Sequence, residues 1–313
     1  MPVSLPKLKS NLSPRHLAGR TLKWSRYSWL DVKYFYRNHL HNGPSKQAYL
    51  KDPPLLSEPQ RRVVEELATR GVSFIHFNEL FREPERWNIL SEAAQDFVNS
   101  ENVRKSIQSY QSNYGNAAWK EYVVKLRDEN PTIRWDSPWL QLSLDPPVLN
   151  IVNSYLGLWS KLIHHDMWYT IPLDADRAPI ASQRWHRDPE DRHMVKVFLY
   201  FSEVDAGAGP LEYVVGSSVG GPYQNLWRHG YSPGEELEQR VASSDRLLCA
   251  GRAGTFVFCN TNGFHRGGFS AKRERVFSVS TFVTPASSSQ RYFKVDWGSN
   301  QSGLSEAARF ALT

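Results

Sequence analysis

Cysteine is scarce in this 313-residue sequence, which has only Cys249 and Cys259. Two cysteines ten residues apart, without a Cys-x-x-Cys motif, provide neither a disulfide framework nor a thiolate zinc site. We therefore expect a reducing compartment, the cytoplasm. Long apolar runs are also missing. The longest covers five residues, Val197 to Phe201, whereas a membrane-spanning helix needs about 20, so no membrane span is expected.

Acidic residues are nearly absent from residues 1–55, which contain ten Lys and Arg against Asp31 and Asp52. This arm therefore carries a charge of +8, and the remaining residues sum to −2 because the whole chain carries +6. Cations mixed with aromatic residues such as Trp24 and Trp29 could bind nucleic acid or another anionic surface. They could equally be a segment docked on the fold. Since no continuous run of Lys and Arg occurs, we favour docking over nucleic-acid binding.

The composition is that of a soluble, core-forming protein, with 40% hydrophobic and 22% charged residues. We expect a single domain over 56–313 whose first part, 56–160, is a helical support. It follows a loop over 43–59 that is rich in Gly and Pro. The periodicity predicts a helix over 58–70, a strand over 72–77 and further helices near 84–112, 116–127 and 145–157.

Beyond residue 160, short apolar or alternating segments are separated by glycine-rich turns. This pattern is typical of an antiparallel sandwich or barrel. We expect this barrel to cover 161–285 and a C-terminal extension to cover 286–313. Residues 216–245, rich in glycine and then in charge, are the expected lid. The fold class is therefore α+β with a mainly β core.

The segment Trp185-His186-Arg187-Asp188 carries the strongest chemical signal. Alternate side chains of a strand share a face, so His186 and Asp188 point the same way. His265 follows another predicted strand and a tight turn. Two imidazoles and one carboxylate inside a barrel form a facial triad for non-haem Fe(II), and the absence of thiolates argues against a closed zinc site.

Arg275, ten residues after His265, begins an alternating strand near the end of the predicted barrel. A buried arginine presents a fork of donors that matches a carboxylate. An open Fe(II) face together with such an anchor suits 2-oxoglutarate, whose keto-acid end chelates iron while its far carboxylate meets the arginine. Arg273 is the competing candidate, but it falls in a turn, and we favour Arg275.

Two stretches carry a family resemblance: WHRDPEDRHMVKVFLYFSEVDAGAGPLEYVVGSSVGG and GFHRGGFSAKRERVFSVSTF. They resemble the phytanoyl-CoA dioxygenase family of Fe(II)/2-oxoglutarate-dependent oxygenases over about 145–285. The resemblance implies a double-stranded β-helix (jelly roll), with His186, Asp188 and His265 as iron ligands and Arg275 as the cosubstrate arginine. One departure is Phe277, which stands where many such enzymes have a serine. A hydroxyl partner for the carboxylate must then come from elsewhere.

Weaker candidates surround these residues. Arg184 shares the strand face of His186 and could meet an anionic substrate group, or be an exposed residue at the start of the strand. Lys196 either faces inward with a carboxylate partner or faces outward, because a buried lysine is costly without one. By family analogy we add to the cosubstrate pocket Lys196, Phe198, Tyr200, Gln183 and Tyr169. Three further histidines are expected at the surface: His164, His165 and His193.

The expected function is a dioxygenase that uses Fe(II), 2-oxoglutarate and O2 to hydroxylate a C–H bond of a small molecule, giving succinate and CO2. Desaturation, epoxidation or cyclisation of a natural-product scaffold would use the same site. Halogenation is not expected, because Asp188 fills the position that chloride needs. A metalloenzyme without 2-oxoglutarate, a non-catalytic barrel and a nucleic-acid- or anion-binding protein that uses its arm are the alternatives.

Overall fold

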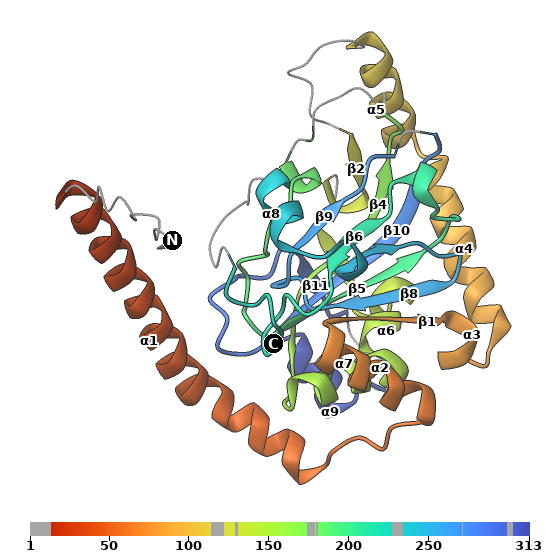
Figure 1. The fold of residues 1–313 in the computed structure, drawn as a ribbon. Coiled ribbons are helices and arrows are strands. Elements are labelled where there is room, and N and C mark those ends of the chain that lie inside the picture. Colours follow the sequence, from red (N-terminus) through yellow and green to blue (C-terminus); the bar gives the residue numbers. More distant parts are fainter. Residues whose placement is uncertain are drawn as a thin grey trace.

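The computed structural model describes residues 14–113, 122–128, 131–173, 179, 181–226, 234–270, 272–298 and 303–313. For residues 14–31 and residue 235 it describes the backbone alone. Within these residues an antiparallel core is flanked by helices (Figure 1). No helix among them is both long enough and apolar enough to span a bilayer.

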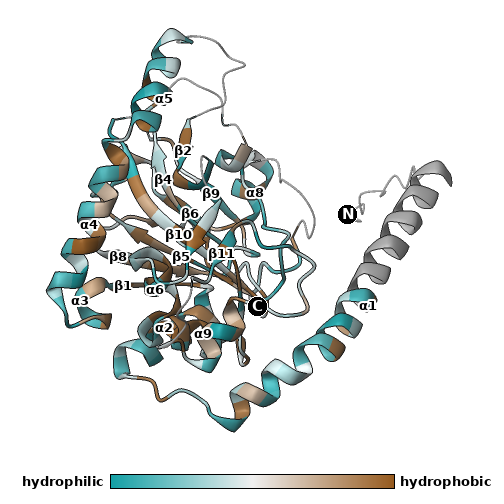
Figure 2. Ribbon diagram, turned by 180° about the vertical axis from the view of Figure 1, so that it is seen from behind, coloured by the Kyte–Doolittle hydropathy of each residue, from teal (hydrophilic) through white to brown (hydrophobic). Residues whose placement is uncertain are grey.

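The core is a six-stranded sheet in which every neighbouring pair is antiparallel. In spatial order its strands are β1 (Val72–His76), β8 (Thr255–Cys259), β5 (Met194–Tyr200), β10 (Arg275–Val283), β4 (Lys161–Thr170) and β2 (Val123–Lys125). Hydrophobic residues are concentrated in these strands (Figure 2). A second, three-stranded antiparallel sheet consists of β7 (Arg246–Cys249), β6 (Leu211–Val214) and β9 (His265–Gly267).

The alternation of strand β5 defines the two faces of the large sheet. Val195, Val197 and Leu199 point to one face and join the main hydrophobic core with the helices. Phe198 and Tyr200 point to the other face, where they pack with residues of the small sheet. The two sheets therefore lie face to face, and the space between them is partly filled by aromatic side chains. This confirms the predicted antiparallel core; the finer prediction of a double-stranded β-helix is taken up below.

Helices cover the outer face of the large sheet. Gln60 fixes α2 (Glu58–Arg70) against the start of α7 (Pro146–Leu156), since its side-chain amide donates to the carbonyls of Pro146 and Pro147 at 3.3 and 3.2 Å. Gly71 ends α2 with a left-handed φ of 80°. The helices after the arm are α2 (Glu58–Arg70), α3 (Phe77–Leu80), α4 (Pro84–Val98), α5 (Glu101–Ser112), α6 (Pro138–Leu144), α7 (Pro146–Leu156), α8 (Gly234–Arg240) and α9 (Glu306–Ala311).

Several sequence predictions hold for these elements and one is wrong. The helix over 58–70, the strand from 72 and the helix at 145–157 are confirmed. The stretch 84–112 divides at Asn99 and Ser100 into two helices. The helix expected over 116–127 is wrong in its described part, where β2 pairs with β4 and a short 3-10 turn, Leu126–Asp128, follows; its first part lies outside the described residues. Sheet pairing here overrides the local helical pattern.

Short elements complete the fold. Strand β3 (Thr132–Arg134) pairs in parallel with β11 (Lys294–Asp296), so the C-terminal region returns to the helical part of the chain. Further 3-10 turns are η2 (Ala181–Gln183), η3 (Ala206–Ala208) and η4 (Ser243–Asp245). Cys249 and Cys259 are buried free thiols.

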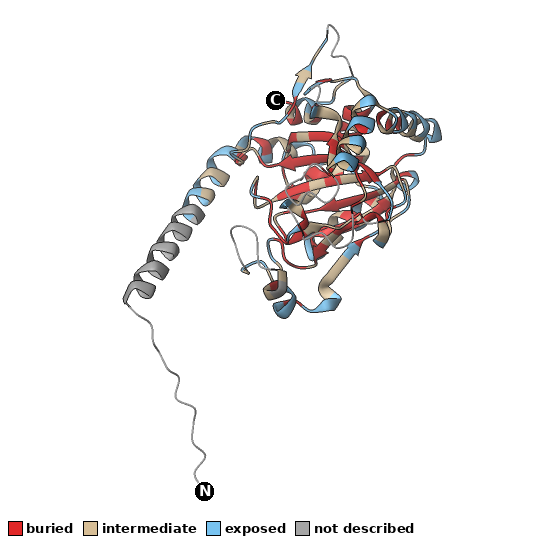
Figure 3. Ribbon diagram, turned by 90° about the horizontal axis from the view of Figure 1, so that it is seen from above, coloured by how far each residue is buried: buried red, intermediate tan, exposed pale blue. Residues whose placement is uncertain are grey.

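The N-terminal arm contains a 38-residue helix, α1 (Pro14–Lys51), that projects from the rest of the molecule (Figure 3). The loop expected from residue 43 therefore begins only after Lys51, because α1 continues through Pro44. Contacts with the body support this part of the helix. Oδ1 of Asn42 accepts the amide of Ala286 at 2.8 Å, and the carbonyl of Ser45 accepts the amide of Trp159 at 3.4 Å.

Candidate metal centre

Three side chains predicted as metal ligands meet between the two sheets. His186 forms a two-way backbone bridge with His265, each amide lying 3.0 Å from the other's carbonyl. Asp188 reaches both rings: Oδ1 lies 3.7 Å from Nε2 of His186 and Oδ2 lies 3.4 Å from Nε2 of His265. All three residues are buried, and one ligand atom from each lies within 4.8 Å of the others.

Backbone carbonyls set the tautomer of both imidazoles. Nδ1 of His186 lies 2.8 Å from the carbonyl of Arg184, and Nδ1 of His265 lies 3.0 Å from the carbonyl of Gly263. A carbonyl only accepts, so Nδ1 carries the proton and the lone pair of Nε2 points toward Asp188. Burial, and then the nearby His265, lower the pKa of His186 to about 4. Near neutral pH its ring is therefore uncharged, as a metal ligand must be.

The turn before His265 holds the Asp188 segment in place. The amide of Asp188 donates to the carbonyl of Thr261 at 2.9 Å, and the side chain of Asn262 donates back to the carbonyl of Asp188 at 3.1 Å. Gly263 allows close packing in this turn, since a Cβ there would lie 2.2 Å from the hydroxyl oxygen of Tyr213. The ligands from two distant parts of the chain are thus joined by backbone contacts.

Arg187, between two of the predicted ligands, is a residue that the sequence reasoning missed. Its guanidinium donates to the carbonyls of Ser217, Asn262, Tyr223, Gln224 and Leu226 at 2.5–3.3 Å. It also lies 3.9 Å from the centre of the Phe264 ring. Arg187 therefore ties the first part of the expected lid, 216–226, to the ligand-bearing segments, whereas residues 227–233 of that lid lie outside the described residues.

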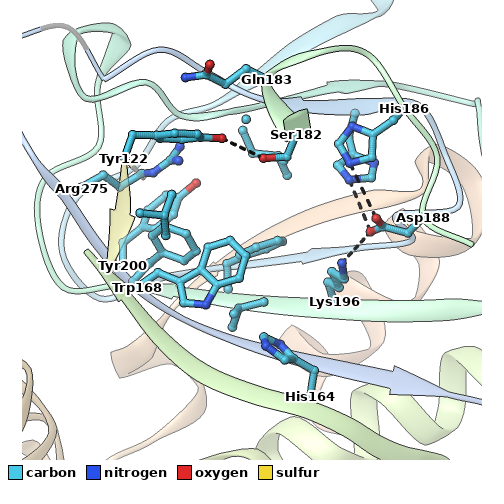
Figure 4. A pocket seen from close by; sticks show the side chains of 18 of the residues that line it. Tyr122, His164, Trp168, Ser182, Gln183, His186, Asp188, Lys196, Tyr200 and Arg275 are labelled. Atoms are coloured by element: carbon cyan, nitrogen blue, oxygen red, sulfur yellow. Dashed lines mark hydrogen bonds and ion pairs between the residues drawn. The ribbon is translucent and has the colours of Figure 1, made fainter. Parts of the chain in front are cut away.

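Lys196 faces inward, which decides between its two predicted orientations. Its ammonium lies 2.7 Å from Oδ2 of Asp188 and 3.9 Å from Oε1 of Glu190. Burial by itself raises the pKa of Asp188, but Lys196 together with the imidazoles of His265 and His186 outweighs this effect and holds that pKa well below its ordinary value. Asp188 is therefore a carboxylate with a strong neighbouring cation (Figure 4).

A cavity of about 470 Å³ lies in front of the three ligands. Aromatic and aliphatic side chains form much of its wall, among them Trp168, Phe277 and Val279. The structure thus brings together in one cavity most of the residues predicted for the site: Gln183, His186, Asp188, Lys196, Phe198, Tyr200, His265 and Arg275.

Arg275 lies at the end of this cavity away from the triad (Figure 4). It is buried, and burial lowers its pKa. Its Nη1 donates to the carbonyl of Gly209, and no carboxylate among the residues that the structure describes forms an ion pair with it. Arg273 is instead half exposed and pairs with Asp205 at 2.8 Å and Glu203 at 3.6 Å. Of these two arginines, Arg275 is therefore the buried one, and it has no carboxylate partner among the described residues.

Hydroxyl groups stand near Arg275 although Phe277 replaces the expected serine. Tyr122 lies beside Arg275, and its hydroxyl is 3.1 Å from Oγ of Ser182 (Figure 4). Tyr200 also lines the cavity, but its hydroxyl donates to the carbonyl of Cys249 at 2.7 Å. Tyr122 and Ser182 are the residues among those described that bring hydroxyls to this end of the cavity beside Tyr200, and nothing in the local sequence pointed to them.

Two predicted site residues lie elsewhere. Tyr169 is adjacent in strand β4 to the inward-facing Trp168, so it points to the opposite face and joins the main core. Arg184 is exposed, and its Nε donates to the carbonyl of Pro179 at 3.0 Å. Its contribution to the site is the backbone carbonyl that orients His186.

The prediction that three histidines lie at the surface is wrong for His165, and the other two are partly buried. His165 is buried and bonds to the hydroxyl of Ser280 at 2.9 Å. His193 is half-buried, with its ring 4.8 Å from that of Tyr155. His164 lines the candidate cavity, where burial and then Lys196 lower its pKa to about 3.

No protein-family model matches this chain, and no curated protein matches it. Solved structures with some similarity include SnoN, a non-haem alpha-ketoglutarate-dependent epimerase from nogalamycin biosynthesis (15% identity over 72% of this chain and 82% of that one, TM-score 0.48). Another is AviO1 from Streptomyces viridochromogenes (11% identity, 75% and 100% of the chains, TM-score 0.47). A third is EctD from S. alaskensis with 2-oxoglutarate and 5-hydroxyectoine (14% identity, 72% and 76%, TM-score 0.45).

Proposed function

We propose that this chain is an Fe(II)- and 2-oxoglutarate-dependent oxygenase that hydroxylates a small molecule and converts 2-oxoglutarate to succinate and CO2. The observation that carries the proposal is one cavity with two different ends. One end holds His186, Asp188 and His265, and the other holds a buried Arg275 without a carboxylate partner among the described residues. The three ligands could hold a metal that a dicarboxylate chelates through one end, and Arg275 could bind the carboxylate at its other end.

The ligand set supports iron over a structural zinc ion. It offers two imidazole Nε2 atoms and one carboxylate, with no thiolate among the residues lining the cavity. Three ligands on one face leave other positions open, the arrangement of non-haem Fe(II) sites. When bound, the metal would supply the activation of O2, with one oxygen atom going to succinate and the other to the product. The chain's own task is to hold the imidazoles neutral and Asp188 charged, as the carbonyls and Lys196 do.

The far end supports 2-oxoglutarate as cosubstrate. The buried guanidinium of Arg275 favours a carboxylate as its partner, since two donors can meet two oxygens in a low-dielectric space. The Tyr122 and Ser182 hydroxyls stand beside it as further donors. A volume of about 470 Å³ is in the range of small-molecule sites. It leaves room for a substrate group next to the cosubstrate.

The remaining wall favours a largely apolar substrate group. Trp168, Phe198 and Phe277 supply aromatic surface, and His164 is neutral near pH 7 because its pKa is lowered to about 3. An uncharged imidazole can exchange a hydrogen bond with a hydroxyl or carbonyl but does not attract a carboxylate. Desaturation, epoxidation and cyclisation would use the same cavity. The proposal includes the double-stranded β-helix fold and membership of the phytanoyl-CoA dioxygenase family.

The proposal is tested by iron-dependent consumption of 2-oxoglutarate. Purified chain with Fe(II), ascorbate, O2 and 2-oxoglutarate is screened with small molecules for succinate formation by NMR. We expect a substrate-stimulated signal that Asp188→Ala removes. Arg275→Gln should lower it strongly at the same 2-oxoglutarate concentration, whereas Arg273→Gln, on the surface, should retain it. Equal succinate formation by the wild type and Asp188→Ala would contradict the proposal. Metal binding without any use of 2-oxoglutarate would favour the metalloenzyme alternative.

A further inference from the structure

Helix α1 presents an apolar stripe that no described residue covers. Val32, Phe35, Tyr36 and Leu40 are 45%, 57%, 62% and 72% exposed. Their spacing of three and four residues places them on one helix face. Exposed large hydrophobic residues elsewhere on the described chain are scattered, whereas these four follow one another along a single element. Such a stripe indicates a surface that meets something apolar.

The opposite face of α1 turns toward the body of the protein. Lys33, Tyr34 and Arg37 line a second cavity, about 760 Å³, between α1 and the body. The hydroxyl of Tyr34 donates to Oδ1 of Asp191 at 3.2 Å, and the guanidinium of Arg192 lies 4.6 Å from the Tyr34 ring centre. These contacts, with that of Asn42, fix the rotation of the helix. The apolar stripe therefore faces away from the body, where a large surface could approach it.

The charge of the arm indicates what that surface is. Residues 1–55 carry +8 while the rest of the chain sums to −2. We propose that α1 binds the surface of an anionic lipid bilayer, lying in the plane of the membrane with Val32, Phe35, Tyr36 and Leu40 inserted at the boundary of headgroups and acyl chains. Basic helices with an apolar face that includes aromatic residues bind in this way, and each cation near an anionic surface adds to the attraction.

Other occupants fit the observations less well. A second copy of α1 would bring two helices of the same strong charge together, which opposes pairing. Nucleic acid would use the cations and the aromatic rings, but it offers no apolar phase for Val32 and Leu40. An anionic bilayer satisfies both the charge and the aliphatic side chains. The inference does not depend on the chemistry of the candidate metal centre.

The test uses the full chain and two kinds of vesicle, pure phosphatidylcholine and an equal mixture of phosphatidylcholine with phosphatidylserine. We expect cosedimentation with the mixed vesicles only, and weaker binding as salt rises. The triple variant Phe35→Ser, Tyr36→Ser, Leu40→Ser removes most of the stripe and should bind at least about tenfold more weakly. Tyr292→Ser, a change at a 60% exposed aromatic residue of the body, is the matched control and should bind as the wild type does.

Two further measurements keep the outcomes distinct. Thermal unfolding followed by circular dichroism should be unchanged in the triple variant, because the three side chains are exposed. Equal vesicle binding by the wild type and the triple variant would overturn the proposal. The proposal would also be overturned if the wild type bound neither kind of vesicle but formed a dimer in sedimentation velocity that the triple variant did not form. The same holds if the wild type bound single-stranded RNA and the triple variant did not.

Discussion

The ammonium of Lys196 lies 2.7 Å from Oδ2 of Asp188 in the wall of the candidate cavity, and only 17% and 10% of the two side chains are exposed. A lysine thus partners the carboxylate that the proposed function assigns to a metal. A divalent metal would bring a second positive charge to the same carboxylate. The role of Lys196 can therefore be separated from that of the metal by comparing protein with and without metal.

Lys196→Met should destabilise the metal-free protein by about 3–5 kcal/mol, because it leaves a buried carboxylate without its partner. Saturating Fe(II) should reduce this loss, because the metal supplies a new positive partner for the Asp188 carboxylate and binds only the folded chain. Urea unfolding under anaerobic conditions, with and without Fe(II), measures the loss of unfolding free energy and the part of it that the metal restores. Lys105→Met, at an exposed pair with Glu101, should change neither result. A loss of the same size with and without metal would mean that Asp188 does not bind it.

Each ligand substitution, His186→Ala, Asp188→Ala and His265→Ala, should weaken Fe(II) binding by more than about 100-fold. The reason is that partners outside the ligand set alone change metal affinity about 10–100-fold. Arg184→Ala is the control, because this residue contributes to the site through its backbone carbonyl and its side chain is exposed. Anaerobic titration gives the affinities. Wild-type affinity in any one alanine variant would remove that residue from the proposed triad.

Arg275→Gln should raise the 2-oxoglutarate concentration needed for half-saturation roughly 30-fold to several thousand-fold. The basis is that losing one buried, charge-assisted pair costs about 2–5 kcal/mol. Arg273→Gln should raise it by less than about fivefold, because Arg273 is half exposed and already engaged with Asp205. Fe(II) affinity without cosubstrate should be unchanged in both. If Arg273→Gln had the larger effect, the assignment of the anchor would be wrong.

The stability of the fold should fall as the pH is lowered from about 6.5 toward 3, in part because of His165. Burial, and then the charge of Arg127, lower its pKa to about 3 in the folded state. The unfolded chain therefore takes up a proton at about pH 6.5 that the folded chain refuses. The loss from this one group is at most about 1.4 kcal/mol per pH unit. The unfolding free energy of His165→Gln should show a shallower slope over this interval, and parallel curves would refute the assignment.

The sequence predicted the parts of the site that follow from strand geometry. The expected alternation placed His186 and Asp188 on one face, although the structure has an isolated bridge at His186 and no strand at this segment. The strand beginning at Arg275 put that residue in the cavity and left Arg273 outside it. These features need only local periodicity, which is why they could be predicted without the fold.

The remaining features depend on contacts between distant segments. Whether Lys196 faces inward depends on the position of Asp188, and the face occupied by Tyr169 depends on the pairing of β4 with β10. Arg187 appears in the sequence as an ordinary charged residue, yet its carbonyl partners come from 217–226 and from Asn262. The continuation of α1 through Pro44 likewise depends on contacts with the body.

The central claim, that iron and 2-oxoglutarate bind together in the cavity between His186 and Arg275, is tested most directly by an anaerobic spectroscopic titration. Fe(II) is added to the purified chain alone and then with saturating 2-oxoglutarate. The account predicts a weak visible metal-to-ligand absorption band that appears only when both are present. Arg275→Gln should need much more 2-oxoglutarate to produce it. The absence of any band when Fe(II) is bound and 2-oxoglutarate is saturating would contradict the account.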